Sequence, residues 1–171
     1  MLKPKNLLST TYSLQPKIIL GIDPGLADTG FGIIEKLGSK LKMIDYGSIK
    51  TKAGEKSEQR LKEISESLNR LIKKYRPETM AVEKLFFCKN VKTAIAVGQA
   101  RGVVILAAGQ NQLKVVEFTP LQIKLALTSY GKASKKQVQQ MVKIVLSLKQ
   151  IPKPDDAADA LAAAICCAHS I

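Results

Sequence analysis

Four carboxylates stand where they could act together on a metal ion. Asp23 and Glu83 each end a short apolar run that reads as a buried strand. Asp156 and Asp159 are three residues apart at the start of a predicted C-terminal helix, so both project from one face of it. An acid at the end of a buried strand is costly unless something compensates its charge. We therefore predict that the four side chains form one cluster.

Such a cluster predicts metal-assisted phosphodiester chemistry. Carboxylate oxygens are hard ligands that suit Mg²⁺, with Mn²⁺ as a substitute. Four of them can hold two ions about 4 Å apart, the arrangement used for in-line attack on a phosphodiester. The only histidine, His169, lies two residues from the C-terminal end, which excludes a Ser-His-Asp site. The three cysteines form no CxxC pair, so zinc is not expected and a reduced chain is.

The composition of the cluster stays open at one position. Asp155 and Asp159 are four apart and would share a helix face as well. Asp155 at a helix N-terminus could instead simply complement the helix dipole. Any one of these acids could also be a cap or a surface ion pair. The spacing alone does not choose between Asp155 and Asp156.

The charge of the chain points to a polyanionic partner. There are 27 Lys and Arg against 14 Asp and Glu, a formal net charge of +13. Eleven basic residues and one acid, Glu117, lie between Lys89 and Lys153, and the next six residues contain three acids. This distribution favours a basic surface that holds nucleic-acid phosphates beside acids that hold cations.

Hydrophobic patterning predicts one α/β domain. Strands are expected at Ile18–Asp23, Thr29–Ile34, Lys40–Lys50, Thr79–Glu83 and Lys114–Phe118, the first three as an antiparallel meander. Helices are expected from an N-cap at Ser57 to Pro77, over Val91–Gly109, after a cap at Thr119, from a cap at Ser134 to about Leu148, and from Pro154 or Asp155 to about Ala168. The order predicts a five-stranded mixed sheet with helices on both faces.

The predicted helix Val91–Gly109 is rich in alanine and glycine. Small residues let a neighbouring element approach closely. They could pack the helix onto its own sheet or form a dimer interface, and the sequence leaves both readings open.

The first 17 residues are basic and contain no acid. We interpret residues 1–17 as a disordered extension or an early start codon rather than a transit peptide, and residues 18–171 as the domain. No apolar run reaches the roughly 20 residues of a membrane span. We expect a cytoplasmic, nucleoid-associated protein.

Four motifs resemble the RuvC family of Holliday junction resolvases over about Ile18 to Ala168. They are GIDPGLADTG at 21–30, AVEKLFFCKN at 81–90, GQARG at 98–102 and DDAADALAAAI at 155–165. The resemblance implies an RNase H-like fold and a homodimer that resolves four-way DNA junctions in recombination and repair. Each subunit would nick one of two strands of like polarity, leaving 5′-phosphates and 3′-hydroxyls. The branch-migration proteins RuvA and RuvB are the implied partners.

The same resemblance implies roles for single residues. Asp23 and Glu83 match the first two catalytic metal ligands, and Asp156 and Asp159 match the last pair, which selects Asp156 over Asp155. Some relatives have His at the position of Asp156. The GQARG helix matches the dimer region.

The resemblance also implies a DNA-binding set. Phe86 matches an aromatic that sits against bases at the junction, although it or Phe87 could instead be core. Lys124 and Lys136 match positions that contact the DNA backbone. The expected helpers, each of which could equally be a solvated surface charge, are Lys89, Arg101, Lys132 and Lys135.

Parts of the sequence are also compatible with three other functions. The GIDPGLADTG loop also resembles the phosphate loop of actin-like ATPases and sugar kinases, but those proteins need two such lobes and 171 residues accommodate one. An RNase H-like nuclease acting on another nucleic-acid structure would have the same acids. A junction-binding protein without catalysis is disfavoured because all four acids are present.

Overall fold

The computed structural model describes residues 15–84 and 91–171. The elements in chain order are β1 (Lys17–Asp23), β2 (Asp28–Leu37), β3 (Lys40–Lys50), α1 (Ser57–Tyr75), β4 (Thr79–Glu83), α2 (Val91–Gln110), β5 (Lys114–Phe118), α3 (Pro120–Thr128), α4 (Lys135–Val145) and α5 (Asp155–Ser170). Every strand and helix predicted from the sequence is present, and most boundaries agree within two residues.

The five strands form one mixed sheet of order β3-β2-β1-β4-β5. β1, β2 and β3 pair antiparallel, which confirms the predicted meander. β1 pairs parallel with β4, and β4 pairs parallel with β5. β1 is therefore the central strand, and its carboxyl end lies beside the carboxyl end of β4.

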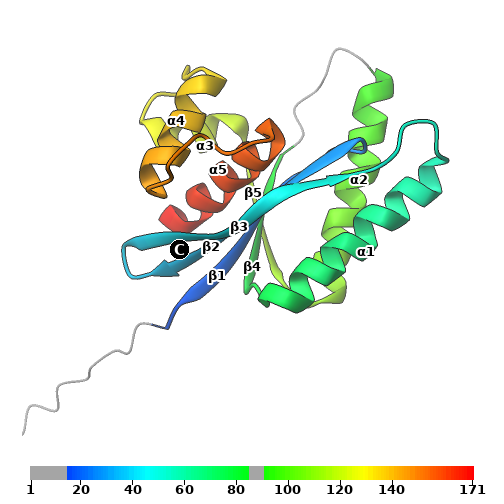
Figure 1. Cartoon of the computed structure of the whole chain (residues 1–171), viewed down its shortest axis with the longest axis horizontal. Coiled ribbons are helices and arrows are strands. Elements are labelled where there is room, and N and C mark those ends of the chain that lie inside the picture. Colours follow the sequence, from blue (N-terminus) through cyan, green and yellow to red (C-terminus); the bar gives the residue numbers. More distant parts are fainter. Residues whose placement is uncertain (1–14, 85–90) are drawn as a thin grey trace, which may run out of the picture.

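Helices cover both faces of the sheet, as predicted. Figure 1 shows α3, α4 and α5 on one side and α1 and α2 on the other. The side chains of β1 alternate between these layers because successive residues of a strand point to opposite faces. Ile19 belongs to the core on the α5 side, whereas Leu20 and Ile22 belong to the core on the α1–α2 side.

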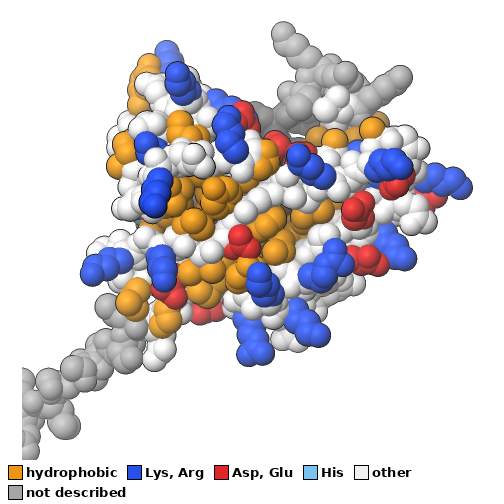
Figure 2. Space-filling model, in the orientation of Figure 1, with side chains coloured by type: hydrophobic (Ala, Val, Ile, Leu, Met, Phe, Trp, Pro, Cys, Tyr) orange, Lys and Arg blue, Asp and Glu red, His pale blue; other side chains and the backbone are white. Residues whose placement is uncertain are grey.

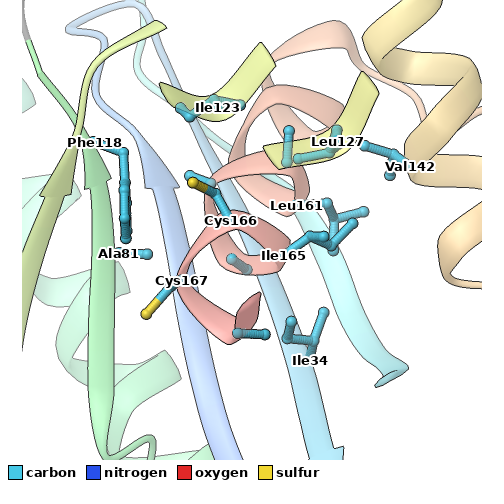
Figure 3. Close-up of a cluster of buried hydrophobic side chains, with 14 of the residues drawn as sticks. Ile34, Ala81, Phe118, Ile123, Leu127, Val142, Leu161, Ile165, Cys166 and Cys167 are labelled. Carbon is cyan, nitrogen blue, oxygen red and sulfur yellow. The ribbon is translucent and has the colours of Figure 1, made fainter. Parts of the chain in front are cut away.

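The core on the α5 side is built around an alanine-rich helix. Figure 3 shows Leu161, Ile165 and Cys166 of α5 between the strands and the helices α3 and α4. Cys166 and Cys167 are free and buried, and burial raises the pKa of Cys166 to about 11. These two cysteines therefore serve as small packing groups rather than as nucleophiles.

The helix ends follow local side-chain chemistry. Thr119 and Ser134 form capping boxes with Gln122 and Gln137, which confirms both predicted caps. The prediction for Ser57 was wrong: it is the first helical residue. The cap position belongs to the preceding lysine, whose backbone is extended and which has no side-chain capping bond.

The outer boundaries differ slightly from those expected. β1 begins at Lys17, one residue before the predicted strand. Residues 1–14, most of the predicted extension, lie outside the described residues, and the role of that segment stays a prediction. Within the part of the chain that is described, no helix is long and apolar enough to cross a membrane.

Glycines in β1 and β2 let α5 lie directly against the sheet. A Cβ atom on Gly21 would stand 2.0 Å from the Ala160 carbonyl oxygen, and one on Gly30 would stand 2.0 Å from the Asp156 carbonyl oxygen. A Cβ on Gly32 would meet the Leu161 side chain at 2.7 Å. A methyl group at the first two positions would collide with helix backbone, which cannot rotate away. The distance between α5 and the sheet thus depends on the absence of these side chains.

This packing generates a stability prediction. Replacing Gly30 by Ala should lower the free energy of unfolding by about 2 kcal/mol or more, because the new methyl group must push the first turn of α5 off the sheet. Glu63→Ala is the control, since Glu63 is exposed on α1, outside the packing of α5 on the sheet, and Ala favours a helix. Urea unfolding measures both. A Gly30→Ala midpoint equal to that of the unchanged chain would contradict the close-packing account.

Candidate active site

Two strands deliver the first two acids to the same place. Asp23 and Glu83 are the last residues of the parallel neighbours β1 and β4. Gly21 and Ala81, two residues before each acid, lie against α5 or in the core beneath it. Since side chains alternate along a strand, Asp23 and Glu83 lie on that same face of the sheet.

The first turns of α5 deliver the other two acids. The Asp156 backbone lies over Gly30, and Gly30 is the residue of β2 that pairs with Asp23. Asp159 follows one turn later and lines the same cleft as Glu83. The close packing of α5 on glycine therefore brings Asp156 and Asp159 to the strand ends.

The pKa of Asp23 is raised by its burial and by the other acids close to it. Burial of its carboxyl group, followed by the negative charges of Glu83, Asp159 and Asp156, raises this pKa from 3.8 to about 8. The positive charge of Lys135 acts in the opposite direction. At neutral pH and without a bound cation, Asp23 is therefore largely protonated.

Two further acids share this strained environment. Burial raises the pKa of Glu83, and the charge of Asp159 adds to the effect. Burial also raises the pKa of Asp159, although a hydrogen bond from Lys135 lowers it in part. All three acids thus hold their negative charge at a cost, which a bound cation would relieve.

Lys135 is the main positive charge inside the cluster. Its Nζ lies 2.8 Å from Asp159 Oδ2 and 3.8 Å from Asp155 Oδ2. Partial burial opposes its charge, but the hydrogen bond to Asp159 and the nearby aspartates raise its pKa overall. The sequence suggested only a helper in DNA binding for Lys135. Its place among the acids could not be found from the sequence, because only the packing of α4 on α5 creates it.

Two of the four acids, Glu83 and Asp159, line an open cleft of about 170 Å³ together with Lys135. Glu83, Lys124, Lys135 and Asp159 provide its charged lining. Pro120, Ile123, Val138 and Ala162 provide the apolar lining. The positive charge of Lys124 lowers the pKa of Glu83 against the larger effect of burial. The cleft therefore places two lysines beside acids that could hold cations.

Asp155 lies at the edge of this cluster and is hydrogen bonded to a different lysine. Its Oδ1 accepts a hydrogen bond from Lys153 Nζ at 3.0 Å. That contact, followed by the weaker influence of Lys135, lowers the pKa of Asp155. Asp156, and not Asp155, contributes to the field at Asp23. The choice of Asp156 over Asp155 as a metal ligand stays a prediction from the family resemblance.

The remaining basic candidates lie in different settings. Lys132 and Lys136 are exposed, the first between α3 and α4 and the second in the first turn of α4. Arg101 forms a half-buried ion pair between its guanidinium and Glu117 of β5. That pairing ties α2 to the edge strand, and the expected part of Arg101 in DNA binding stays a prediction. Phe86 and Lys89 lie outside the described residues.

Basic side chains are spread over the surface. Figure 2 shows Lys and Arg over the α3–α4 part of the molecule and over the α1 side of the same face, with hydrophobic atoms between them. Acidic side chains on this face are fewer and scattered. A wide basic surface of this kind suits a long polyanion better than a small anionic ligand.

The small residues of α2 divide between two faces. Ala100, Val104, Ala107 and Ala108 are buried against the sheet and α1. The opposite face, which we call the outer stripe of α2, consists of residues spaced by four, three, four and three: Ile95, Gln99, Gly102, Leu106 and Gly109. Ile95 and Leu106 are 58% and 57% exposed, and a Cβ on either glycine would meet nothing within 4 Å. Packing within the chain therefore explains the alanines but not the outer stripe.

The donor set fits hard divalent cations. The convergent side chains offer only carboxylate oxygens, and burial, followed by the charges of neighbouring acids, raises the pKa of Asp23 and of Glu83. Within residues 15–84 and 91–171, however, no three His, Cys, Asp or Glu side chains are already arranged to hold a metal ion. Lys135 Nζ instead contacts one carboxylate oxygen of Asp159.

A mixed sheet of order β3-β2-β1-β4-β5, with helices on both faces and acids at the ends of its central strands, defines an RNase H-like fold. The family model described as crossover junction endodeoxyribonuclease RuvC matches residues 19–167. The chain belongs to the RuvC family.

Individual relatives agree with this assignment. A crossover junction endodeoxyribonuclease RuvC from Halothermothrix orenii is 59% identical over 153 residues, which cover 90% of this chain and 93% of the relative. A solved structure of T. thermophilus RuvC in complex with Holliday junction substrate matches with a TM-score of 0.83 and 35% identity, over 88% of this chain and 92% of that one. The yeast mitochondrial Holliday junction resolvase Ydc2 matches at 13% identity and a TM-score of 0.62, over 88% and 78% of the two chains, and shares the fold.

The raised pKa of Asp23 predicts how stability depends on pH. Between 3.8 and about 8 the folded chain binds a proton at Asp23 that the unfolded chain releases, so the metal-free protein loses stability as the pH rises through this range. Asp23→Asn removes the buried charge and should raise the free energy of unfolding at pH 8 by about 2 kcal/mol, with little change at pH 4. Urea unfolding in a chelator measures the difference.

Asp155→Asn is the matched control for this experiment. Asp155 has a lowered pKa and pairs with Lys153, so its amide should bring no gain at pH 8. A gain for Asp23→Asn that is equal at both pH values would show that burial of a polar group, and not its charge, limits stability.

Proposed function

We propose that this chain is an endonuclease that resolves four-way (Holliday) DNA junctions by paired symmetric nicks during recombination and repair. The observation that carries the proposal is the close approach of carboxylates from β1, β4 and α5 in a RuvC-family chain, two of which line one cleft. The related T. thermophilus RuvC, similar over nearly the whole fold, is described with Holliday junction substrate. The reaction is phosphodiester hydrolysis that leaves 5′-phosphate and 3′-hydroxyl ends.

Asp23, Glu83, Asp156 and Asp159 would hold two Mg²⁺ ions, with Mn²⁺ as a substitute. Support comes from the all-oxygen donor set and from the raised pKa values, which binding of cations would reverse. Such ions, when bound, activate water and stabilise the charge that develops on the leaving oxygen. The chain itself contributes the alignment, because each acid stands on a regular strand or helix.

Lysines beside the acids would hold the DNA backbone at the cleft. Lys124 lines the cleft with Glu83, and Lys135 is within reach of the same space. Exposed Lys132 and Lys136 extend the positive charge along α3 and α4. Because much of the attraction is to phosphates, junction binding should weaken steeply with salt. Phe86 and Lys89 remain proposed junction contacts on the strength of the family resemblance.

The outer stripe of α2 would form a homodimer interface. Ile95 and Leu106 offer apolar contact area, and Gly102 and Gly109 allow a second helix to approach closely. A two-fold dimer presents two equal active sites, and a four-way junction presents two equivalent strands. This match is the proposed basis of both substrate choice and symmetric cutting.

We infer that the protein acts on DNA in the cytoplasm, at the nucleoid. RuvA and RuvB are the proposed partners, since branch migration would move the crossover to the cleavage position. Support for both statements comes from membership of the RuvC family.

Substitution of one acid should separate binding from cutting. Asp23→Asn and Asp159→Asn should each lower the rate of junction nicking by about 100-fold or more while junction affinity changes little, because the acids act on the scissile phosphate rather than on the whole DNA. The measurement is nicking of an end-labelled synthetic four-way junction, with and without Mg²⁺, beside binding in a chelator.

Linear duplex and an RNA–DNA hybrid of the same sequence are the control substrates. Metal-dependent nicks confined to the junction support the proposal. Cutting of the hybrid instead would leave the fold and cleft in place and contradict the substrate class. An equal loss of binding and cutting in both variants would contradict the catalytic role of the acids.

A charge placed on the outer stripe should break the dimer. Leu106→Glu should shift the protein to monomer in analytical ultracentrifugation and abolish paired nicks, because two buried carboxylates would face each other across the two-fold axis. Ile144→Glu on α4 is the matched control, since Ile144 is also 57% exposed but lies on another face. The interface assignment fails if both variants keep the same oligomeric state.

A further inference from the structure

Asp155 is charged, well placed and without a part in the four-acid set. It is the first residue of α5 and stands one turn before Asp159. Its two carboxylate oxygens face two different lysines: Oδ1 accepts from Lys153 at 3.0 Å, and Oδ2 lies 3.8 Å from Lys135 Nζ. A mere complement to the helix dipole would not need either lysine.

Lys135 stands between the two aspartates. Its ammonium is hydrogen bonded to Asp159 Oδ2 at 2.8 Å, whereas its 3.8 Å distance to Asp155 Oδ2 is within ion-pair range but too long for a hydrogen bond. Shortening the second contact by about 1 Å would reach the ordinary length of a charge-assisted hydrogen bond. A small movement of the Lys135 ammonium would therefore let it hydrogen bond to Asp155 Oδ2 instead of Asp159 Oδ2.

A cation at Asp159 would force that movement. Asp159 is one of the proposed metal ligands, and Lys135 already occupies one of its two carboxylate oxygens. A divalent ion and an ammonium group on the same carboxylate repel each other strongly in a partly buried site. Lys135 must then leave Asp159 when a divalent ion binds. The least costly movement is toward Asp155, whose carboxylate already lies 3.8 Å away.

We propose that Asp155 is a positioning residue that receives the Lys135 ammonium when a divalent cation takes Asp159. In the metal-free chain Lys135 is an internal counter-ion that holds the repelling acids together. In the metal-bound chain Asp155 keeps Lys135 at the edge of the cleft, where a phosphate would meet it. This inference rests on the proposed metal ligands and adds a residue outside that set.

The surroundings of Asp155 suit this task. Lys153 holds Oδ1, which leaves Oδ2 directed at Lys135. Gln139, one turn after Lys135 on α4 and 7% exposed, lies beside Asp155 and contributes to the lowering of its pKa after the larger effect of Lys153. Lys153 thus holds one oxygen of Asp155 while the other remains available to Lys135.

Binding of Mn²⁺ alone, without DNA, tests the proposal. Free Mn²⁺ is counted by electron paramagnetic resonance for the unchanged chain, Asp155→Asn, Lys135→Met and the double variant. Lys135→Met should bind Mn²⁺ about three- to tenfold more tightly because the competing ammonium is gone. Asp155→Asn should bind about three- to tenfold more weakly because Lys135 loses its second acceptor. Each tenfold step corresponds to about 1.4 kcal/mol.

The double variant decides how Asp155 acts. If Asp155 works through Lys135, Asp155→Asn should change Mn²⁺ affinity by less than about twofold once Lys135 is Met. The same loss with and without Lys135 would overturn the proposal and mean that Asp155 acts by its own charge. Lys136→Met is the matched control, because it removes a neighbouring exposed lysine that makes no salt bridge to these aspartates among the described residues.

One further variant separates this inference from the proposed function. Asp159→Asn should weaken Mn²⁺ binding strongly if Asp159 is a ligand. Unchanged affinity for that variant would overturn the metal-site assignment itself, whereas weakened affinity with an additive double variant would overturn only the role of Asp155. Thermal unfolding of each variant confirms that the affinities compare folded proteins.

Discussion

The direct packing of α5 on the glycines of β1 and β2 is the constraint on which the site depends. Gly21 and Gly30 leave room for helix backbone at distances where a methyl group would collide with a carbonyl oxygen. Close approach also explains the alanine-rich sequence of α5, since larger side chains would lift the helix from the sheet. Only at this separation do acids from the helix reach acids from the strand ends.

The acids that this packing assembles work against stability. Burial and mutual repulsion raise the pKa of Asp23 to about 8, and they raise the pKa of Glu83 and Asp159 as well. The fold compensates with one internal cation, Lys135, rather than with a full set of partners. Residual negative charge of this kind is what a site needs if it is to attract metal ions, and it follows the general exchange of stability for function at active sites.

The cleft and the proposed dimer surface lie on opposite sides of the sheet. The cleft lies among α3, α4, α5 and the strand ends, whereas the outer stripe of α2 lies on the helix layer across the sheet. The ion pair between Arg101 and Glu117 joins α2 to β5, which neighbours β4 and hence Glu83. In a dimer formed through α2, the position of each cleft would therefore be set by regular strands and helices. Such an arrangement would hold the two clefts at a constant separation, which two cuts at matched positions require.

The amino-acid sequence by itself determined the elements and the strand-end acids. Apolar runs ending in Asp23 and Glu83, the caps at Thr119 and Ser134, and the three-residue spacing of Asp156 and Asp159 are local patterns, and the strands, helices and sheet they predict are present. Tertiary structure alone decided which charges meet. Lys135 joined Asp159 and Arg101 joined Glu117, because such pairings depend on how α4 packs on α5 and how α2 packs on β5. A side chain reaches only a few ångströms, so residues far apart in the sequence can pair only after folding has brought their elements together. The spacing of residues in the sequence therefore predicted the acids but not the basic residues that pair with them.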